Sequence, residues 1–226
     1  MNTYNFSQYF FCDLVMIGVT IVASVISLIQ WRINKELRLI TYYLLATSLI
    51  DIISSYYEIF SKDRNKEMIM GFCSEIYVMT ELTIFFAYLY KNIVKVRMRI
   101  IIKIIFILFF LLISCISATH YFHYYDHPGY SITAIESLFI IIPCLFYFYE
   151  LFLAQQIDLR SHPSFWIVSG ILFYNCCSIP IFLLFDYIQN NISPYYNLAF
   201  ALNYILYTML FLLFIKAYLC KKEVTS

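Results

Sequence analysis

Residues 101–117 read IIKIIFILFFLLISCIS, and Lys103 is the only charged residue in this stretch. A transmembrane β-strand shows about 10 residues of alternating hydrophobicity. A helix needs about 20 mostly apolar residues to cross the hydrocarbon core of a bilayer. Because the stretch is long and almost continuously apolar, it predicts a membrane-spanning α-helix.

The rest of the chain has the same character. Of its 226 residues 62% are hydrophobic and 13% are charged, against roughly 25% charged in soluble domains, and its mean hydropathy is +0.77. Seven apolar segments lie between charged clusters, at residues 10–31, 39–60, 72–90, 100–119, 131–152, 165–187 and 196–219. We therefore predict an all-α integral membrane protein, a seven-helix bundle that forms one transmembrane domain over residues 1–226 and has no soluble domain.

This composition excludes several classes of function. Seven crossings use most of the chain and leave no room for a soluble catalytic domain. A net charge of +1 offers no basic face for nucleic acid. The sequence contains neither an HExxH nor a GxSxG motif, so we do not expect an enzyme.

The basic residues predict the orientation in the membrane, because Lys and Arg are enriched in cytoplasmic loops. With the N-terminus outside and the C-terminus in the cytoplasm, the cytoplasmic side receives twelve of the 15 Lys and Arg residues. These are Arg32, Lys35, Arg38, Lys91, Lys95, Arg97, Arg99, Lys103, Arg160, Lys216, Lys221 and Lys222.

Carboxyl groups inside the predicted spans are the main candidates for a site, because an ionisable residue in lipid is costly and usually functional. Asp51 and Glu81 lie near mid-span, and Glu136 lies about one third of the way into its span. We expect these three, with Tyr174 and Asn175, to bind a small ligand, a proton or a cation in an outward-facing acidic and aromatic cavity. The alternative is that the acids are interfacial, or protonated and hydrogen-bonded to Tyr, Ser or Thr.

Two further groups of residues have ligand chemistry. His120, His123 and His127 stand at i, i+3 and i+7, a spacing that would place three imidazoles on one helical face for a transition metal. An aromatic belt at the membrane interface explains them equally well. Near the outer helix ends, a disulfide could form among Cys12, Cys73 and Cys115.

No cofactor is expected. Retinal proteins need a lysine deep in the last helix, whereas the last span here has only Lys216, close to its cytoplasmic end, and Asn203 at the deeper position. Seven-helix zinc hydrolases need histidines in the second and seventh spans, and this chain has none in either.

The start of the sixth segment, PSFWIVSGILFYN (163–175), together with Glu136 early in the fifth, resembles a pattern of small seven-helix inner-membrane proteins of Bacteroidota. These proteins are similar to the seven-helix sensor regions of histidine kinases. The matching residues of the sixth segment are Pro163, Phe165, Trp166, Ser169, Gly170 and Tyr174. Pro163 also suits a first helical turn, and Ser169 and Gly170 suit close helix packing, so the run has an architectural reading as well.

The resemblance implies a bacterial inner-membrane protein that senses an unknown small ligand. Because the chain has no output domain, we expect it to signal through a separate histidine kinase or another signalling protein. A small transporter or proton-coupled carrier is the alternative, although four glycines and no internal repeat disfavour it. A structural membrane subunit is the third reading.

Overall fold

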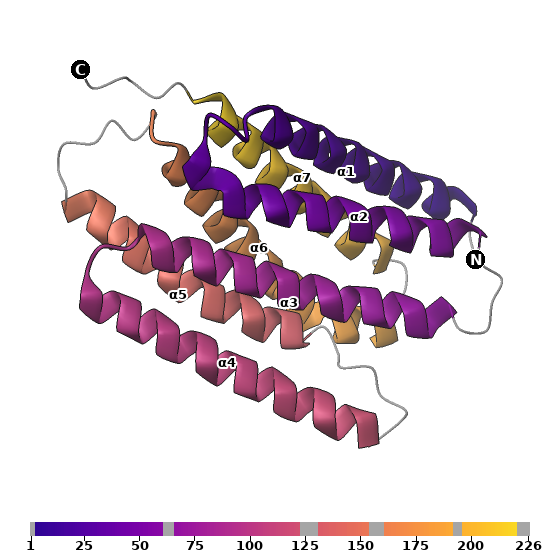
Figure 1. The fold of residues 1–226 in the computed structure, drawn as a ribbon. Coiled ribbons are helices and arrows are strands. Elements are labelled where there is room, and N and C mark those ends of the chain that lie inside the picture. Colours follow the sequence, from indigo (N-terminus) through magenta and orange to yellow (C-terminus); the bar gives the residue numbers. More distant parts are fainter. Residues whose placement is uncertain (1–2, 61–65, 123–130, 154–160, 192–195, 221–226) are drawn as a thin grey trace.

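The computed structural model describes residues 3–60, 66–122, 131–153, 161–191 and 196–220. Within these ranges the chain forms helices and no strand (Figure 1). The α-helices are α1 (Thr3–Ile29), α2 (Arg38–Phe60), α3 (Lys66–Asn92), α4 (Val96–Phe122), α5 (Ser131–Leu153), α6 (Pro163–Asn191) and α7 (Tyr196–Leu219), and a short 3-10 helix, η1 (Lys35–Leu37), precedes α2. The prediction of an all-α fold is confirmed.

Each observed helix covers one predicted apolar segment, and most extend past it. The helix α3 begins six residues before the predicted segment 72–90, and α6 ends four residues after the segment 165–187. The helices are longer than the predicted segments because an apolar segment marks only the part of a helix that lies in lipid. The helical backbone hydrogen bonds continue into the more polar residues on either side. The exception is the predicted end of the first segment, because Trp31 lies in a turn after α1.

Six helices close into a ring, and the seventh packs on its outside. Neighbours around the ring are α1, α2, α3, α5, α6 and α7, with α7 returning to α1. The helix α4 contacts only α3 and α5 closely and lies at the edge of the bundle (Figure 1). Its apolar side chains are accordingly exposed, including Ile104, Leu108 and Leu111. Such a surface suits lipid rather than water.

Six of the helices are long and apolar enough to cross a membrane, among the residues described. They are α1, α2, α4, α5, α6 and α7. The helix α3 has 27 residues and lies alongside the others, and the side chains of its first turns are outside those that the structure describes. The architecture therefore indicates a multi-pass helical membrane protein.

Small and polar residues mediate two of the closest helix contacts. Ser24 of α1 lies 2.8 Å from the hydroxyl of Ser48 and donates to the carbonyl of Leu44 at 2.9 Å, both on α2. At the α6–α7 contact, a Cβ on Gly170 would lie 3.2 Å from the Leu210 side chain and 3.3 Å from the Leu213 Cβ. In a bilayer the hydrophobic effect does not drive helices together, so close packing at small residues and hydrogen bonds between helices take its place.

The helices alternate in direction, so the bundle has two chemically different ends. We call one the basic end: α1, α3, α5 and α7 finish there, and α2, α4 and α6 begin there (Figure 1). Nine described basic residues lie at or within about two turns of it: Arg32, Lys35, Arg38, Lys91, Lys95, Arg97, Arg99, Lys103 and Lys216. We call the opposite one the far end.

Glu150 has a structural task at the basic end. Its carboxylate, near the end of α5, accepts hydrogen bonds from the backbone N–H groups of Val94 and Lys95 at 2.7 and 2.8 Å. These residues lead into α4, where N–H groups lack helical partners and a carboxylate is favourable. This explains why an acid stands among so many basic residues.

Candidate functional site

Glu81 of α3 lies at the centre of a cluster of tyrosines inside the ring. Its side chain is 4% exposed, and the Tyr207 hydroxyl of α7 donates to its Oε2 at 3.0 Å. The Tyr207 hydroxyl also makes a short hydrogen bond with that of Tyr77, which lies 2.7 Å from the hydroxyl of Tyr43 on α2. A chain of phenols thus connects α2, α3 and α7 to one buried carboxyl. We call Tyr43, Tyr77, Glu81, Tyr174 and Tyr207 the Glu81 cluster.

The position of this cluster follows from helix geometry. Tyr77 and Glu81 are four residues apart, so they share one face of α3. Glu81, Tyr174 and Tyr207 all lie about three turns from the basic ends of their helices, at the same depth. The Tyr174 ring of α6 packs on Tyr207 with centroids 4.4 Å apart, and the Tyr77 ring lies 6.0 Å from Tyr207. Four helices therefore supply the cluster.

Glu136 is a second buried carboxyl beside the cluster. It lies about one and a half turns from the start of α5, nearer the far end, and its side chain is 3% exposed. Its Oε1 is buried and has no hydrogen-bond partner in the described part of the chain. Glu136 interacts electrostatically with Glu81 and with Tyr174. A buried polar atom of this kind costs free energy unless something binds it.

Aromatic rings fill the interior between the cluster and the basic end. Phe85 of α3 and Phe214 of α7 are fully buried, with centroids 6.3 Å apart, and each packs on the ring of Tyr43. Phe211 joins them at 6.4 Å from Phe214 and 5.6 Å from Tyr207. We call Phe85, Phe211 and Phe214 the aromatic layer. It separates the buried acids from the polar groups of the basic end.

The basic end has its own hydrogen-bond network, which also includes α7. The Tyr218 hydroxyl donates to the carbonyl of Leu37 at 3.0 Å and lies 2.7 Å from the Thr41 hydroxyl. The amide of Asn34 donates to the Tyr218 carbonyl at 3.4 Å. The end of α7 is thereby attached to the segment that joins α1 to α2.

The sequence-predicted ligand site is only partly brought together. Glu81, Glu136 and Tyr174 lie in one interacting group, as described above. Asp51 is half-buried and interacts most strongly with Asp13 of α1, and it interacts with the cluster only through Tyr43 among the described contacts. The amide of Asn175 donates to the carbonyl of Ile171 within α6 at 2.8 Å. These two residues contribute less to the cluster than the sequence suggested.

The residues of the sixth-segment pattern pack against neighbouring helices at the basic end. Pro163 begins α6, and Phe165 packs on Phe148 of α5 with centroids 6.0 Å apart. The ammonium of Lys216 lies 5.8 Å from the centre of the Trp166 ring. Ser169 is half-buried beside Gly170, at the close contact with α7. Their arrangement agrees with the architectural reading of this run.

The structure describes the three cysteines of the predicted disulfide but not the histidine side chains of the predicted metal site. His120 lies on the last turns of α4, but its side chain, like all of His123 and His127, is outside the described residues. Cys12, Cys73 and Cys115 are free thiols in the structure.

Sequence reasoning missed three members of the cluster, namely Tyr43, Tyr77 and Tyr207. The chain has 22 tyrosines, so their number alone indicated nothing. One local signal was present, because the i, i+4 spacing of Tyr77 and Glu81 places a phenol above a carboxyl on one helix face. The contribution of α2 and α7 depends on helix packing that no spacing in the sequence encodes.

Comparison of the chain with models of known protein families, with curated proteins and with solved structures finds no match. The geometry of the Glu81 cluster is therefore the main indication of function.

Proposed function

We propose that this protein is a receptor or sensor of the bacterial inner membrane, with the Glu81 cluster as the element that receives the signal. The observation that carries the proposal is the buried Glu81 carboxyl, which hydrogen-bonds to Tyr207 and through it to Tyr77 and Tyr43. Ionisable residues inside a membrane bundle usually mark a functional site.

In this proposal all seven helices cross the membrane, with the N-terminus outside and the basic end in the cytoplasm. The helix α3 lies between α2 and α5 in a ring of membrane-length helices, and Glu81 faces the interior of that ring. It can therefore cross without exposing this acid to lipid. The concentration of Lys and Arg at the basic end supports the orientation, because such residues favour the cytoplasmic side.

The ligand should be a proton, or a small molecule that is cationic or donates hydrogen bonds. Two interacting carboxyls away from water attract such groups. Glu136 lies nearer the far end and has an unpartnered oxygen, so it is the natural first contact for a ligand that arrives from outside. Asp51 and Asn175 are secondary contacts in this scheme.

Binding of the ligand at the Glu81 cluster would change the position of α7 relative to the other helices. A change of charge at Glu81 strengthens or removes the hydrogen bond from Tyr207. Tyr218, about three turns further along the same helix, holds the α1–α2 segment at the basic end. A shift of α7 would thus alter the surface offered to a cytoplasmic partner, for which we propose a histidine kinase or another signalling protein.

A transporter is the weaker proposal. Transport requires a path for substrate from one side to the other. The aromatic layer and Tyr43 occupy the interior between the buried acids and the basic end, all four at 1% exposure or less. This arrangement favours a site that is reached from one side only. A structural subunit is the reading that follows if the cluster variants below have no effect.

Tryptophan emission during a proton titration tests the sensor proposal. The chain has two tryptophans, Trp31 and Trp166, and both lie at the basic end, far from Glu81. In lipid nanodiscs, acidification should change the emission of the wild type in a cooperative transition. Glu81→Gln and Glu136→Gln should abolish this transition or shift it by more than one pH unit.

Asp51→Asn is the comparison variant, because Asp51 interacts most strongly with Asp13 of α1 and reaches the cluster through Tyr43. This variant should shift the transition less than Glu81→Gln and Glu136→Gln do. Identical titrations in the wild type and in the Glu81 and Glu136 variants would contradict the proposal. Crosslinking in native membranes should then recover a kinase or regulator with the wild type; repeated recovery of the bare chain would contradict the signalling partner.

A further inference from the structure

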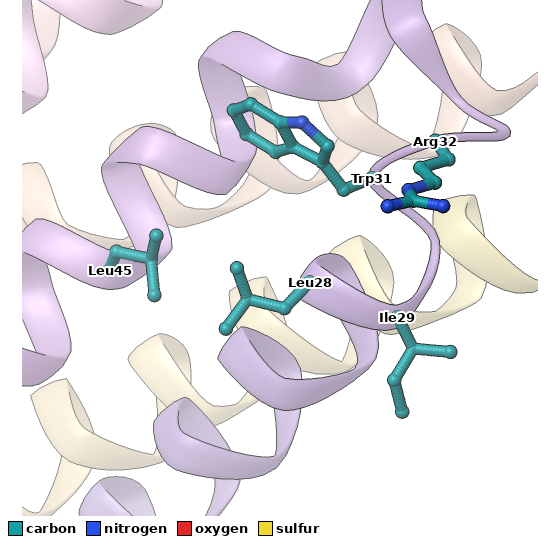
Figure 2. A pocket seen from close by; sticks show the side chains of 5 residues that line it. All are labelled: Leu28, Ile29, Trp31, Arg32 and Leu45. Carbon is teal, nitrogen blue, oxygen red and sulfur yellow. The ribbon is translucent and has the colours of Figure 1, made fainter.

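A shallow groove lies on the outer surface of the bundle between the end of α1 and the start of α2. It has a volume of about 320 Å³ and is lined by Leu28, Ile29, Trp31, Arg32 and Leu45. Figure 2 shows the first two on the end of α1, the next two on the connecting segment and the last on α2. Leu28 and Ile29 are 50% and 69% exposed, so the groove has an apolar wall open to its surroundings.

Trp31 and Arg32 line the part of the groove nearest the basic end, and Arg38 lies beside Trp31. The guanidinium of Arg38 lies 5.3 Å from the centre of the Trp31 ring, which packs edge-on against Tyr42. The Nε of Arg38 is buried and has no hydrogen-bond partner among the described residues. Arg32 is exposed at the groove itself. Positive charge therefore lies directly beside an apolar surface.

We infer that this groove binds an anionic phospholipid. One acyl chain would lie along Leu28, Ile29 and Leu45, and the phosphate would lie at Arg32 and Arg38. Guanidinium groups bind phosphate with two parallel hydrogen bonds. Tryptophan is enriched at the headgroup level of a bilayer, and basic pockets beside transmembrane helices bind anionic headgroups.

The chemistry of the groove favours a lipid over a protein partner. Its wall of exposed Leu28 and Ile29 suits an acyl chain, and the positive charge of Arg32, with Arg38 close by, is complementary to a phosphate. The assignment depends only on the membrane location of the bundle and is independent of the sensor proposal.

Quenching of Trp31 by brominated lipid tests the inference directly. Trp166→Phe leaves Trp31 as the single tryptophan. Vesicles contain equal amounts of phosphatidylglycerol and phosphatidylcholine throughout, with bromine on the acyl chains of one lipid or of the other, so the surface charge stays constant. Brominated phosphatidylglycerol should quench Trp31 at about fivefold lower mole fraction than brominated phosphatidylcholine.

Two further variants connect this preference to the groove. Arg32→Gln, in the Trp166→Phe background, should bring the two quenching curves together. Lys35→Gln removes an equal charge from the same end at an exposed residue that does not line the groove, and it should keep the preference. Equal quenching by both lipids before any arginine is changed would overturn the inference. So would a preference that persists unchanged in Arg32→Gln.

Discussion

Tyr207→Phe is expected to remove one of the hydrogen bonds of Glu81, whose carboxyl also interacts with Tyr77 and Tyr43, while the bundle stays folded. The substitution removes the donor that lies 3.0 Å from the Glu81 carboxyl and also the hydroxyl that contacts Tyr77. The Phe ring keeps the packing on Tyr174. Leaving a buried carboxyl without its donor costs about 1–3 kcal/mol. Reversible unfolding in mixed micelles should show a loss of this size.

A double-mutant cycle separates the hydrogen bond from a general loss of packing. Once Glu81→Leu has removed the acceptor, Tyr207→Phe should cost about 1 kcal/mol less than it does in the wild type. Tyr149→Phe is the control, because Tyr149 is 52% exposed and its ring, near the Lys95 ammonium, is retained. Additive costs at Tyr207 and Glu81 would contradict the contact on which the cluster is built.

Phe214→Ala should have the largest effect of any single change in the aromatic layer. The ring of Phe214 is fully buried and lies within 6.4 Å of the rings of Tyr43, Phe85 and Phe211. Its removal should destabilise the bundle by about 3–5 kcal/mol, the usual cost of such a cavity. It should also admit water between the buried acids and the basic end.

Proton flux into vesicles measures the second effect. Vesicles that contain the wild type should hold a pH gradient, whereas Phe214→Ala should dissipate it faster. Phe173→Ala serves as the control, because this ring is 44% exposed on the outside of α6. A leak through the wild type as fast as through Phe214→Ala would contradict a sealed layer and would favour the transporter.

The helices could be predicted from the sequence because membrane-spanning segments differ so strongly from the loops between them. Every predicted segment lies within or almost within one observed helix, and the errors are at the ends, as at Lys66 and Trp31. Helix neighbours were harder to foresee. The position of α4 outside the ring depends on packing, and no charge or motif in its sequence marks it.

The candidate site was predicted in part, for a similar reason. Glu81 and Glu136 are costly in lipid, so their burial could be anticipated from residue type. Asp51 met the same criterion, but it interacts mainly with Asp13 of α1 and reaches the cluster through Tyr43. Tyr43, Tyr77 and Tyr207 are chemically ordinary in a chain so rich in tyrosine. Their role arises only when three helices place their hydroxyls together.

Infrared difference spectroscopy of the carboxyl groups tests the central proposal most directly, because it observes the proton on Glu81 itself. Spectra of protein in lipid are recorded at successive pH values for the wild type, Glu81→Gln and Tyr207→Phe. We predict a protonated-carboxyl band that changes with pH, that is absent in Glu81→Gln and that shifts in frequency in Tyr207→Phe. A band that is unchanged in both variants would contradict the Glu81 cluster as the element that receives the signal.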